Sequence, residues 1–398
     1  MFNKWLGLNI VLFAHWGLSC MRRYNTPYSS RRVLERATIF IPLSTVSSRQ
    51  FAYMYIRDMI IDFRSDTVTR PTAEMLEVMM TAEVGDDVFG EDETVNSLEA
   101  YAAGLFNMEA GLFCASGTMS NQIAIKCHTE PAEEVVCETQ AHIYRYEGGG
   151  IAFNSGCQVK LVDGNRGRIS AEDIRAVINP VDIHKPPTRL VSLENTSNRG
   201  GGSCYDIEEI KKISELCRQE NLRLHLDGAR LFNALIARRE KPGDYGALFD
   251  SISICLSKGL GAPVGSILLG NNAFIQRARR IRKLLGGGMR QAGYLAAAGL
   301  YALKNNVNRL QDDHAHAKQI EQVLKGLNYV KSIMPVETNI IIFEVETCRT
   351  AAGTVAKLKE KGVLAYAIAA QQVRLVTHLD ISQSMTDKAC SILEDLQR

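Results

Sequence analysis

Short apolar segments alternate with amphipathic segments along most of the chain from residue 60 onward. Apolar runs of strand length occupy residues 110–116, 133–139, 156–163, 188–194, 222–227, 251–257 and 264–270. Helical patterns lie between them, at residues 119–128, 170–178, 206–221 and 228–237. This repeated alternation predicts an α/β fold with a mostly parallel sheet that is covered by helices on both faces.

The pattern changes beyond residue 305. A long helical pattern is followed by two short strands, another helix and a last strand, at residues 307–326, 329–333, 338–346, 350–362 and 372–380. We therefore expect a large domain over residues 59–305 and a smaller C-terminal α/β domain over residues 306–398.

The first 58 residues differ in composition from the rest. Basic and hydroxyl side chains are frequent up to Arg57, and the only acidic residue is Glu35. This composition is typical of an organelle transit peptide. One alternative is a secretory signal after Lys4, although His15 interrupts the apolar run, which is also too short to span a membrane. Another is that translation starts at Met59; the location expected is mitochondrial or cytoplasmic.

Overall composition restricts the class of function. The chain has 398 residues, of which 46% are hydrophobic, and its formal net charge is only +2. That balance gives no basis for binding nucleic acid, and we expect no membrane association. Ten scattered cysteines form no CxxC pair and no zinc-like cluster, so we expect small buried side chains rather than disulfides or a metal site.

Polar residues follow three of the predicted strands. In parallel α/β sheets, ligands bind at the carboxyl ends of the strands. Gly117 and Thr118 follow the first strand and open a helix, whose free backbone N–H groups suit a phosphate. Asp227 follows another strand, and Lys258 stands between a third strand and a glycine turn. Taken singly, each has a commoner explanation, as a helix cap or a solvated lysine.

The combination of these residues predicts a cofactor. Pyridoxal phosphate needs a phosphate anchor, a carboxylate for its pyridine nitrogen and an amine for its aldehyde carbon. Neighbouring strands lie about 4.8 Å apart, so one ring can bridge Asp227 and Lys258. His142 follows a further strand and is placed to stack on that ring.

Long motifs of the chain resemble those of a known family. They are "DFRSDTVTRPT", "VGDDVFGEDETVN", "SGTMSNQ", "AHIYRYEGGG", "LENTSN", "HLDGARLFNA", "CLSKGLGAPVGS", "RKLLGGGMRQAG" and "VRLVTHLD". From about Met59 to its end, the chain resembles the low-specificity L-threonine aldolases, which are fold-type-I pyridoxal-phosphate enzymes. The resemblance implies an aspartate-aminotransferase-like fold, with a mostly parallel seven-stranded sheet in the large domain. It also implies a homodimer or homotetramer.

The resemblance also implies a role for each matching cofactor residue. Lys258 resembles the lysine that forms the Schiff base, and Asp227 the partner of the pyridine nitrogen. His142 resembles the histidine that stacks on the ring, and it is a candidate base. Gly117 and Thr118 resemble the phosphate cradle.

Further residues match positions that contact the substrate or the cofactor. Ser65, Arg230 and Arg374 resemble the set that binds the substrate carboxylate and contacts the cofactor. Lys283 and Arg290 resemble residues near the cofactor phosphate, and Arg290 is expected to reach in from a neighbouring subunit.

Two positions depart from the family pattern on the substrate side. Ser197 stands where the family usually has the histidine that faces the substrate β-hydroxyl, and Phe89 where it often has tyrosine. A serine without an activating partner is not a base at neutral pH, so His142 or a water linked to the cofactor phosphate must take the proton. We therefore expect Ser197→His to raise threonine cleavage.

The implied activity is reversible cleavage of L-threonine or L-allo-threonine to glycine and acetaldehyde, a step of threonine catabolism and glycine formation. The two departures leave a related activity open, namely an amino-acid racemase or a β-eliminating lyase that uses pyridoxal phosphate. A catalytically silent scaffold of the same fold is the remaining alternative, against which the intact set of Lys258, Asp227 and Arg374 argues.

Overall fold

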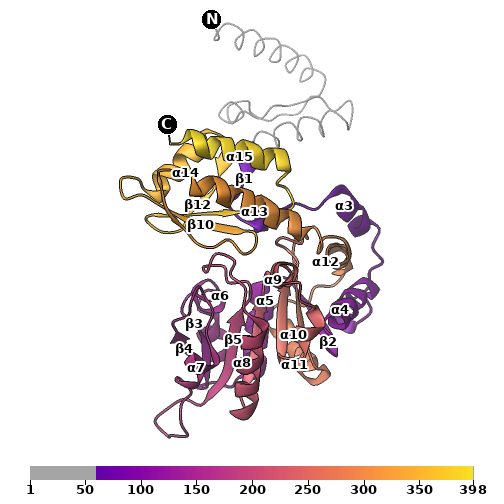
Figure 1. Cartoon of the computed structure of the whole chain (residues 1–398). Helices are drawn as coiled ribbons and strands as arrows, with labels where there is room; N and C mark the ends of the chain where they lie inside the picture. The colour runs from indigo at the N-terminus through magenta and orange to yellow at the C-terminus, as the bar shows by residue number, and fades with distance from the viewer. Residues whose placement is uncertain (1–59, 398) are drawn as a thin grey trace, which may run out of the picture. The chain divides into compact units, whose positions relative to one another are not determined.

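The computed structural model describes residues 60–397. The predictions made above for residues 1–58 concern a segment outside this range. Chain direction can be followed in Figure 1 by colour, from indigo near β1 (Ile61–Asp62) to yellow at α15 (Gln383–Asp395).

A seven-stranded sheet forms the centre of the larger part of the fold. Its strands, in spatial order, are β2 (Ala110–Cys114), β8 (Ser266–Gly270), β7 (Ser251–Cys255), β6 (Arg223–Gly228), β5 (Thr188–Glu194), β3 (Glu134–Glu138) and β4 (Gln158–Val162). Strands β7, β6, β5, β3 and β4 run parallel, and β8 is antiparallel to both β7 and β2. The predicted mostly parallel sheet is thus confirmed.

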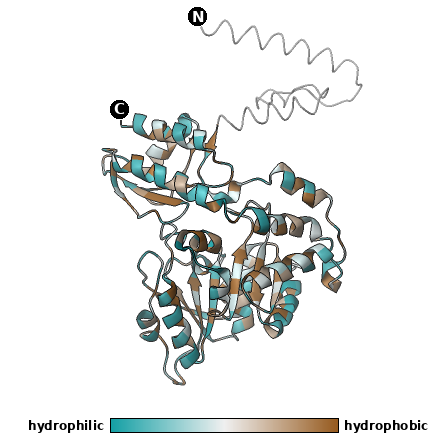
Figure 2. Cartoon of the chain, turned by 45° about the vertical axis from the view of Figure 1, so that its right-hand side comes forward, coloured by the Kyte–Doolittle hydropathy of each residue, from teal (hydrophilic) through white to brown (hydrophobic). Residues whose placement is uncertain are grey.

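Burial explains why these segments form strands. Every residue of the central strand β7 is buried, as is every residue of β3 and β8. A strand covered on both faces carries apolar or small side chains at most positions, as Ser-Ile-Ser-Ile-Cys of β7 and Ser-Ile-Leu-Leu-Gly of β8 do. Figure 2 shows this as brown strands between helices that carry teal on their outer sides. The edge strand β4 is buried at only one residue, Val162.

Helices cover the large sheet. Their bounds are α3 (Ala73–Met80), α4 (Glu93–Leu105), α5 (Gly117–His128), α6 (His142–Arg145), α7 (Ala171–Arg175), α8 (Ile207–Gln219), α9 (Leu231–Arg238), α10 (Pro242–Gly246), α11 (Asn272–Leu284) and α12 (Gly293–Asn305). Helix α8 shows why such segments form helices that pack on the sheet. Ile210, Ile213 and Leu216 recur at helical spacing and are buried in the core, while charged residues face outward. Short 3-10 turns lie at Asp66–Val68 and Asp87–Phe89, and a π-helical turn at Ile151–Ser155.

A second, antiparallel sheet follows in the chain. Its strands, in spatial order, are β12 (Tyr366–Ala367), β13 (Gln372–Val376), β10 (Ile340–Val345) and β9 (Val330–Ile333), and α13 (Leu310–Lys325), α14 (Ala351–Glu360) and α15 belong to the same part. Strand β1 pairs in parallel with β11 (Val363–Leu364), so Ile61 and Phe63 pack into this second core.

The parallel strands place their carboxyl ends along one edge of the large sheet. Glu194 at the end of β5 is in register with Asp227 of β6, and Asp227 is in register with Ser253 of β7. The loops that follow these strands therefore meet at one edge, where the strand-end rule predicts the site. Within the described residues the cysteines are free, and all but Cys348 are buried.

Candidate active site

Asp227 is held at the end of β6 by a buried amide. The residue is 2% exposed. Its Oδ1 accepts a hydrogen bond from the backbone N–H of Ala229 at 3.1 Å, and its Oδ2 accepts one from Nδ2 of Asn121 at 2.9 Å. The carboxylate is thus fixed in the plane defined by two donors, which suits a partner for a ring nitrogen.

His142 begins helix α6 beside Asp227 and is oriented by a second carboxylate. Its Nδ1 lies 3.0 Å from Oε1 of Glu147, whose side chain is fully buried. Glu147 also accepts hydrogen bonds from Asn121 at 2.9 Å and from Gln122 at 2.7 Å. One side-chain atom each of His142, Glu147 and Asp227 lies within 4.8 Å of the others, so these groups form one cluster.

The acidic surroundings change the protonation of two groups. Burial lowers the pKa of His142, but the hydrogen bond to Glu147 and the negative charges of Asp227 and Glu147 outweigh it, so that pKa lies above its usual value. Burial and the charge of Asp227 raise the pKa of Glu194 to about 7. Glu194 holds the backbone of two neighbouring loops, because it accepts hydrogen bonds from the N–H groups of His142 and Asn198, both at 2.9 Å.

Lys258 follows β7, and its side-chain amine has no hydrogen-bond or ion-pair partner among the described residues. It is partly exposed, and between residues 60 and 397 its side chain forms no hydrogen bond or ion pair. Its backbone carbonyl is fixed instead, by a hydrogen bond of 3.1 Å from the hydroxyl of Thr69. Its positive charge acts on Asp66, His142 and Cys255, which places the amine among the groups of this sheet edge.

Gly117 and Thr118 open helix α5 with free backbone donors. The hydroxyl of Ser116 caps the N–H of Met119 at 3.2 Å, and the N–H groups of Gly117 and Thr118 have no acceptor in the described part of the chain. A Cβ atom at Gly117 would lie 2.5 Å from Sγ of Cys255, so this close approach of helix and strand requires glycine. Such a helix end suits a phosphate group.

Arg230 forms a buried ion pair with Asp66. Nε and Nη2 of Arg230 donate to Oδ2 and Oδ1 of Asp66, both at 2.7 Å, and both side chains are almost fully buried. Burial alone would raise the pKa of Asp66, but the Arg230 guanidinium holds it well below its usual range. Ser65, next in the chain, accepts a hydrogen bond from the N–H of Thr67 at 3.2 Å.

Arg374 reaches the site from β13 of the second sheet. Its Nη1 donates to Oδ1 of Asn198 at 2.9 Å and its Nη2 to the carbonyl of Arg64 at 3.1 Å. Its Nε is buried and has no partner in the described residues. Burial and the nearby charge of Arg230 lower the pKa of Arg374 to about 10. A buried guanidinium with an unpaired N–H is a suitable anchor for a carboxylate.

Ser197 occupies a closely packed position in the loop after β5. It is 2% exposed, and its Oγ accepts a hydrogen bond from the backbone N–H of Gly200 at 3.2 Å. A Cβ atom at Gly167 would lie 1.9 Å from this Oγ, so the loop that contains Gly167 rests directly on the serine. The next residue, Asn198, is the one that contacts Arg374.

Phe89, Lys283 and Arg290 are exposed side chains, of which Phe89 and Arg290 contact each other. Nη1 of Arg290 donates to Asp86 at 2.7 Å, and its guanidinium lies 5.8 Å from the centre of the Phe89 ring. Lys283 is exposed at the end of α11. Within the described residues, no hydrogen bond or ion pair joins this group to Lys258, Asp227 or His142.

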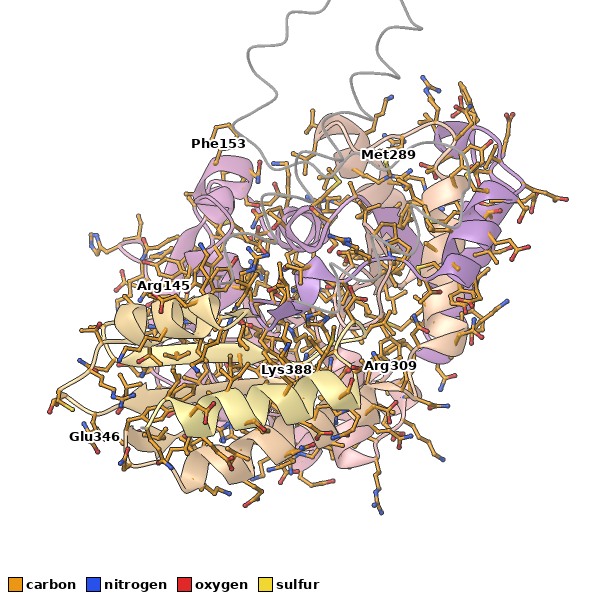
Figure 3. The ribbon with its side chains drawn as sticks, turned by 90° about the horizontal axis from the view of Figure 1, so that it is seen from above. Arg145, Phe153, Met289, Arg309, Glu346 and Lys388 are labelled. Atoms are coloured by element: carbon orange, nitrogen blue, oxygen red, sulfur yellow. The ribbon has the colours of Figure 1, made fainter. Side chains whose placement is uncertain are left out.

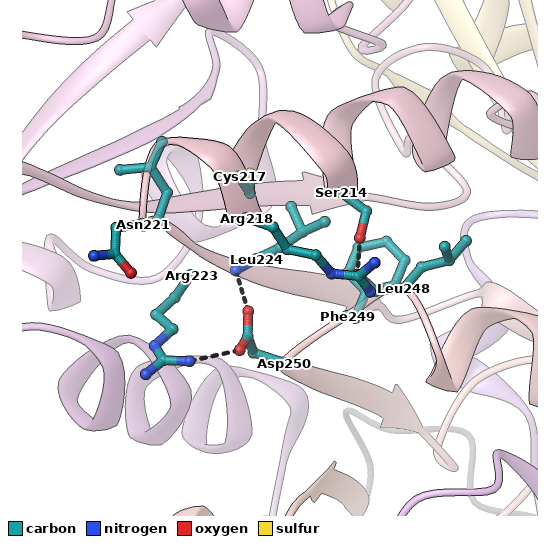
Figure 4. A pocket seen from close by; sticks show the side chains of 10 residues that line it. Ser214, Cys217, Arg218, Asn221, Arg223, Leu224, Leu248, Phe249 and Asp250 are labelled. Atoms are coloured by element: carbon teal, nitrogen blue, oxygen red, sulfur yellow. Dashed lines mark hydrogen bonds and ion pairs between the residues drawn. The ribbon is translucent and has the colours of Figure 1, made fainter.

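A cavity of about 240 Å³ lies at the opposite edge of the sheet, at the amino ends of β6 and β7 (Figure 4). Asp250 there accepts hydrogen bonds from Arg223 and from the N–H of Leu224, and Ser214 donates to the carbonyl of Leu248. Because these polar groups are paired with one another, this cavity presents no set of groups comparable to that around Lys258.

The groups around Lys258 fit pyridoxal phosphate. The structure brings together a free amine, a fixed carboxylate, an imidazole and two unpaired backbone donors, together with an unpaired guanidinium N–H on the substrate side. Residues 62–376 match the family of beta-eliminating lyases. The chain is also 46% identical, over 81% of its length and 95% of the relative's, to the low-specificity L-threonine aldolase of Escherichia coli strain K12.

The chain belongs to the low-specificity L-threonine aldolase family. Its fold agrees with this family and with pyridoxal-phosphate enzymes more widely. A solved structure of Leishmania major threonine aldolase superposes with a TM-score of 0.75 at 22% identity, and covers 85% of this chain and all of that one. A solved structure of SPT with PLP has a TM-score of 0.68 at 13% identity, and covers 84% and 87% of the two chains. This aldolase-family chain is therefore a fold-type-I lyase that depends on pyridoxal phosphate.

Four residues of this candidate site were not singled out from the sequence. They are the buried polar residues Asp66, Asn121, Glu147 and Glu194. Each lies inside a motif that was recognised, namely "RSDTVT", "SGTMSNQ", "AHIYRYEGGG" and "LENTSN". The available signal was a carboxylate or amide close to a predicted cofactor residue, but only the fold shows that each one contacts it.

Proposed function

We propose that this protein cleaves L-threonine and L-allo-threonine to glycine and acetaldehyde. The observation that carries the proposal is the cluster of Lys258, Asp227 and His142 at the carboxyl edge of the sheet. It occurs in a chain that is 46% identical, over 325 aligned residues, to an E. coli threonine aldolase, and the alignment covers 95% of that enzyme.

Each cofactor residue has a defined task in this proposal. The N–H groups of Gly117 and Thr118 would bind the phosphate, Lys258 would present its amine to the aldehyde carbon, and His142 would hold the pyridine ring. Asp227 would hold a proton at the ring nitrogen. Bound pyridoxal phosphate supplies the electron-withdrawing ring that accepts charge from the substrate Cα.

The substrate carboxylate is assigned to Arg374, with Arg230 and Ser65 beside it. The buried, unpaired Nε of Arg374 supports this role, because a guanidinium with an N–H free of protein partners binds a carboxylate strongly. Asp66 holds Arg230 in place through two hydrogen bonds. Fixing the carboxylate sets the rotation about the substrate Cα and hence which of its bonds is broken.

The base that takes the β-hydroxyl proton is assigned to Nε2 of His142. Glu147 accepts from Nδ1, so the neutral ring carries its proton there and leaves the lone pair of Nε2 for the substrate. Ser197 is not suited to this role, because its hydroxyl already accepts a hydrogen bond from Gly200 and is buried against Gly167.

We also propose that the enzyme is a homodimer or a homotetramer. Arg290, Lys283 and Phe89 are exposed, as a group that serves a neighbouring subunit's phosphate site would be. Large apolar side chains are also exposed, among them Met80, Leu284 and Phe153, the last standing at the periphery in Figure 3. Phenylalanine and methionine are enriched at contacts between subunits.

We also propose a domain division and a location. Residues 59–305 form the cofactor-binding domain and residues 306–398 the small domain. Residues 1–58 are a targeting segment for mitochondria, and the alternative location of the protein is the cytoplasm. Between residues 60 and 397, no helix has both the length and the apolar character needed to cross a membrane.

The activity is tested with the full chain, purified and reconstituted with pyridoxal phosphate. Incubation with L-threonine, L-allo-threonine, L-serine and L-alanine is followed by assays for acetaldehyde, glycine, formaldehyde and D-amino acids. Equal amounts of acetaldehyde and glycine from threonine are expected. Racemised amino acids, or keto acid and ammonia without glycine, would refute the assignment.

A further inference from the structure

Four polar side chains form a hydrogen-bonded chain that runs from Asn121 of α5 to β6 and β7 and back to His128 of α5, on the face of the large sheet that this helix covers. Oδ1 of Asn121 lies 3.2 Å from Nε2 of His225. Nδ1 of His225 lies 2.8 Å from Oγ of Ser251, and this hydroxyl lies 2.7 Å from Nε2 of His128. His225 and Ser251 are fully buried, and Asn121 is 1% exposed, so water does not compete for these groups.

The donors and acceptors along this chain have only one consistent arrangement. An amide oxygen only accepts, so Nε2 of His225 carries the proton that it donates to Asn121. A neutral His225 must then accept the hydroxyl proton of Ser251 at Nδ1, and Ser251 in turn accepts from Nε2 of His128. Burial lowers the pKa of both His225 and His128 to about 3, so both rings are neutral at neutral pH.

The orientation of the Asn121 amide matters because two carboxylates share it. Its Nδ2 donates one N–H to Asp227 and the other to Glu147, both at 2.9 Å. Rotating the amide by half a turn would point its oxygen at both carboxylates and its N–H groups at the N–H of His225. Both contacts would be repulsive, so the two carboxylates and the donor from His225 favour the same orientation of the amide.

We propose that His225 is a positioning residue of the active site, which holds the Asn121 amide so that both of its N–H groups meet Asp227 and Glu147. Ser251 accommodates the tautomer that this requires, because its hydroxyl can donate to Nδ1 of His225 while it accepts from Nε2 of His128. The inference rests on the proposed function only for the tasks given to Asp227 and to the Glu147–His142 pair. The charged or titrating groups that face the two carboxylates are His142 on α6, Glu194 on β5 and Lys258 after β7.

The tautomer can be measured without cofactor or substrate. The full chain is labelled with ¹⁵N-histidine, and long-range ¹H–¹⁵N spectra are recorded on the cofactor-free protein, with His225→Gln used to assign the signals. We expect His225 in the Nε2–H form, with no titration above about pH 5. A ring protonated at Nδ1 alone, or one that titrates near pH 6.5, would overturn the proposal.

Two variants separate a positioning role from simple packing. His225→Leu removes the donor, whereas His225→Gln keeps an N–H for Asn121. His316→Leu is the matched control, because His316 is a buried histidine of α13 outside this chain of contacts. Circular dichroism first establishes that each variant is folded. The dissociation constant for pyridoxal phosphate is then measured by absorbance, and kcat and KM for L-threonine are measured separately.

We expect His225→Leu to bind pyridoxal phosphate roughly tenfold more weakly and to lose roughly tenfold in kcat with KM almost unchanged, the effect of one buried hydrogen bond. His225→Gln should recover most of both losses, and His316→Leu should match the wild type. A folded His225→Leu variant with wild-type cofactor binding, or a Gln variant no better than Leu, would overturn the proposal. A wild-type protein that binds the cofactor but cleaves no threonine would refute the proposed function instead, and the binding measurements would still decide the role of His225.

Discussion

Nδ1 of His142 and Oε1 of Glu147 lie 3.0 Å apart, and the carboxylate is fully buried while the imidazole is 30% exposed. The ring therefore has a fixed partner on its inner side and an accessible nitrogen on its outer side. This is the relationship that a general base requires, since the partner sets both the orientation and the tautomer of the ring. The same partner raises the pKa of His142, against the effect of burial.

Replacing Glu147 by glutamine should therefore shift the pH dependence of the reaction. A base must be neutral, so kcat/KM is expected to rise as the pH rises through the pKa of His142. Glu147→Gln removes a group that raises this pKa, and the rise should move to lower pH. Loss of orientation should also lower the maximal rate by roughly 10- to 100-fold, which is less than the roughly 10²- to 10⁴-fold that a general base contributes, because His142 itself remains. The pH profiles of kcat/KM for the two proteins check both effects. If kcat/KM of Glu147→Gln rises at the same pH as the wild type, or at a higher pH, Glu147 is not the partner that raises the pKa of His142.

Replacing Lys258 by alanine should abolish the stable attachment of pyridoxal phosphate. Lys258 is expected to supply the only amine that bonds to the aldehyde carbon, so the variant should show no visible absorbance after reconstitution and gel filtration. Threonine cleavage should fall on the order of 10³-fold or more. Lys304→Ala is the control, since Nζ of Lys304 instead lies over the ring of Tyr101, 5.4 Å from its centre. Mass spectrometry after borohydride reduction locates the modified lysine, and a label on another lysine would contradict the assignment.

Replacing Asp66 by asparagine should destabilise the fold in a manner that depends on pH. Removing one partner of a buried ion pair costs about 3–5 kcal/mol, because Arg230 would keep an uncompensated charge. The pKa of Asp66 is depressed in the folded protein, so its contribution is complete above the unfolded value near 4 and is lost as the pH falls toward the folded value. The difference in melting temperature between the wild type and Asp66→Asn should thus be largest at neutral pH and should become smaller below about pH 4.

Asp62→Asn is the matched control for this ion pair. Asp62 pairs with Arg64 at 2.6 Å, but the two side chains are 23% and 39% exposed. A solvated pair of this kind contributes about 1 kcal/mol or less. Equal losses of stability in the two variants would show that burial of the Asp66–Arg230 pair is not what stabilises this part of the fold.

Sequence patterns predicted the parts of the site that depend on local order, and not those that depend on distant contacts. Asp227 lies near the end of β6, and Lys258 and Gly117 come shortly after the ends of β7 and β2, so the strand-end rule places them at one edge. Arg230 and Asp66 lie 164 positions apart, and Arg374 and Asn198 lie 176 apart. No periodicity specifies such pairs, because they form only when the two sheets pack together.

The direction of a strand could be predicted from the sequence only in part, for a similar reason. The apolar run at residues 264–270 predicted a strand, but the alternation of strands and helices did not reveal that β8 runs antiparallel to its neighbours. A buried strand has the same continuous apolar pattern in either direction. Only the short connection from β7 to β8, with no helix between them, carried that information.

Ser197→His should raise the rate of threonine cleavage and lower the thermal stability. A histidine would return a titratable nitrogen to the loop after β5, where the family usually has one, and would add a second candidate base beside His142. It must also displace the loop at Gly167, since this glycine already touches Oγ of the serine. Small-to-large changes in a packed site typically cost about 1–3 kcal/mol.

Ser197→Gln, which adds similar volume without a base, should share the loss of stability but not the gain in rate. Measured kcat/KM values and melting temperatures for the three proteins decide the matter: if the folded histidine variant turns over threonine no faster than the wild type, the site has been rebuilt around serine.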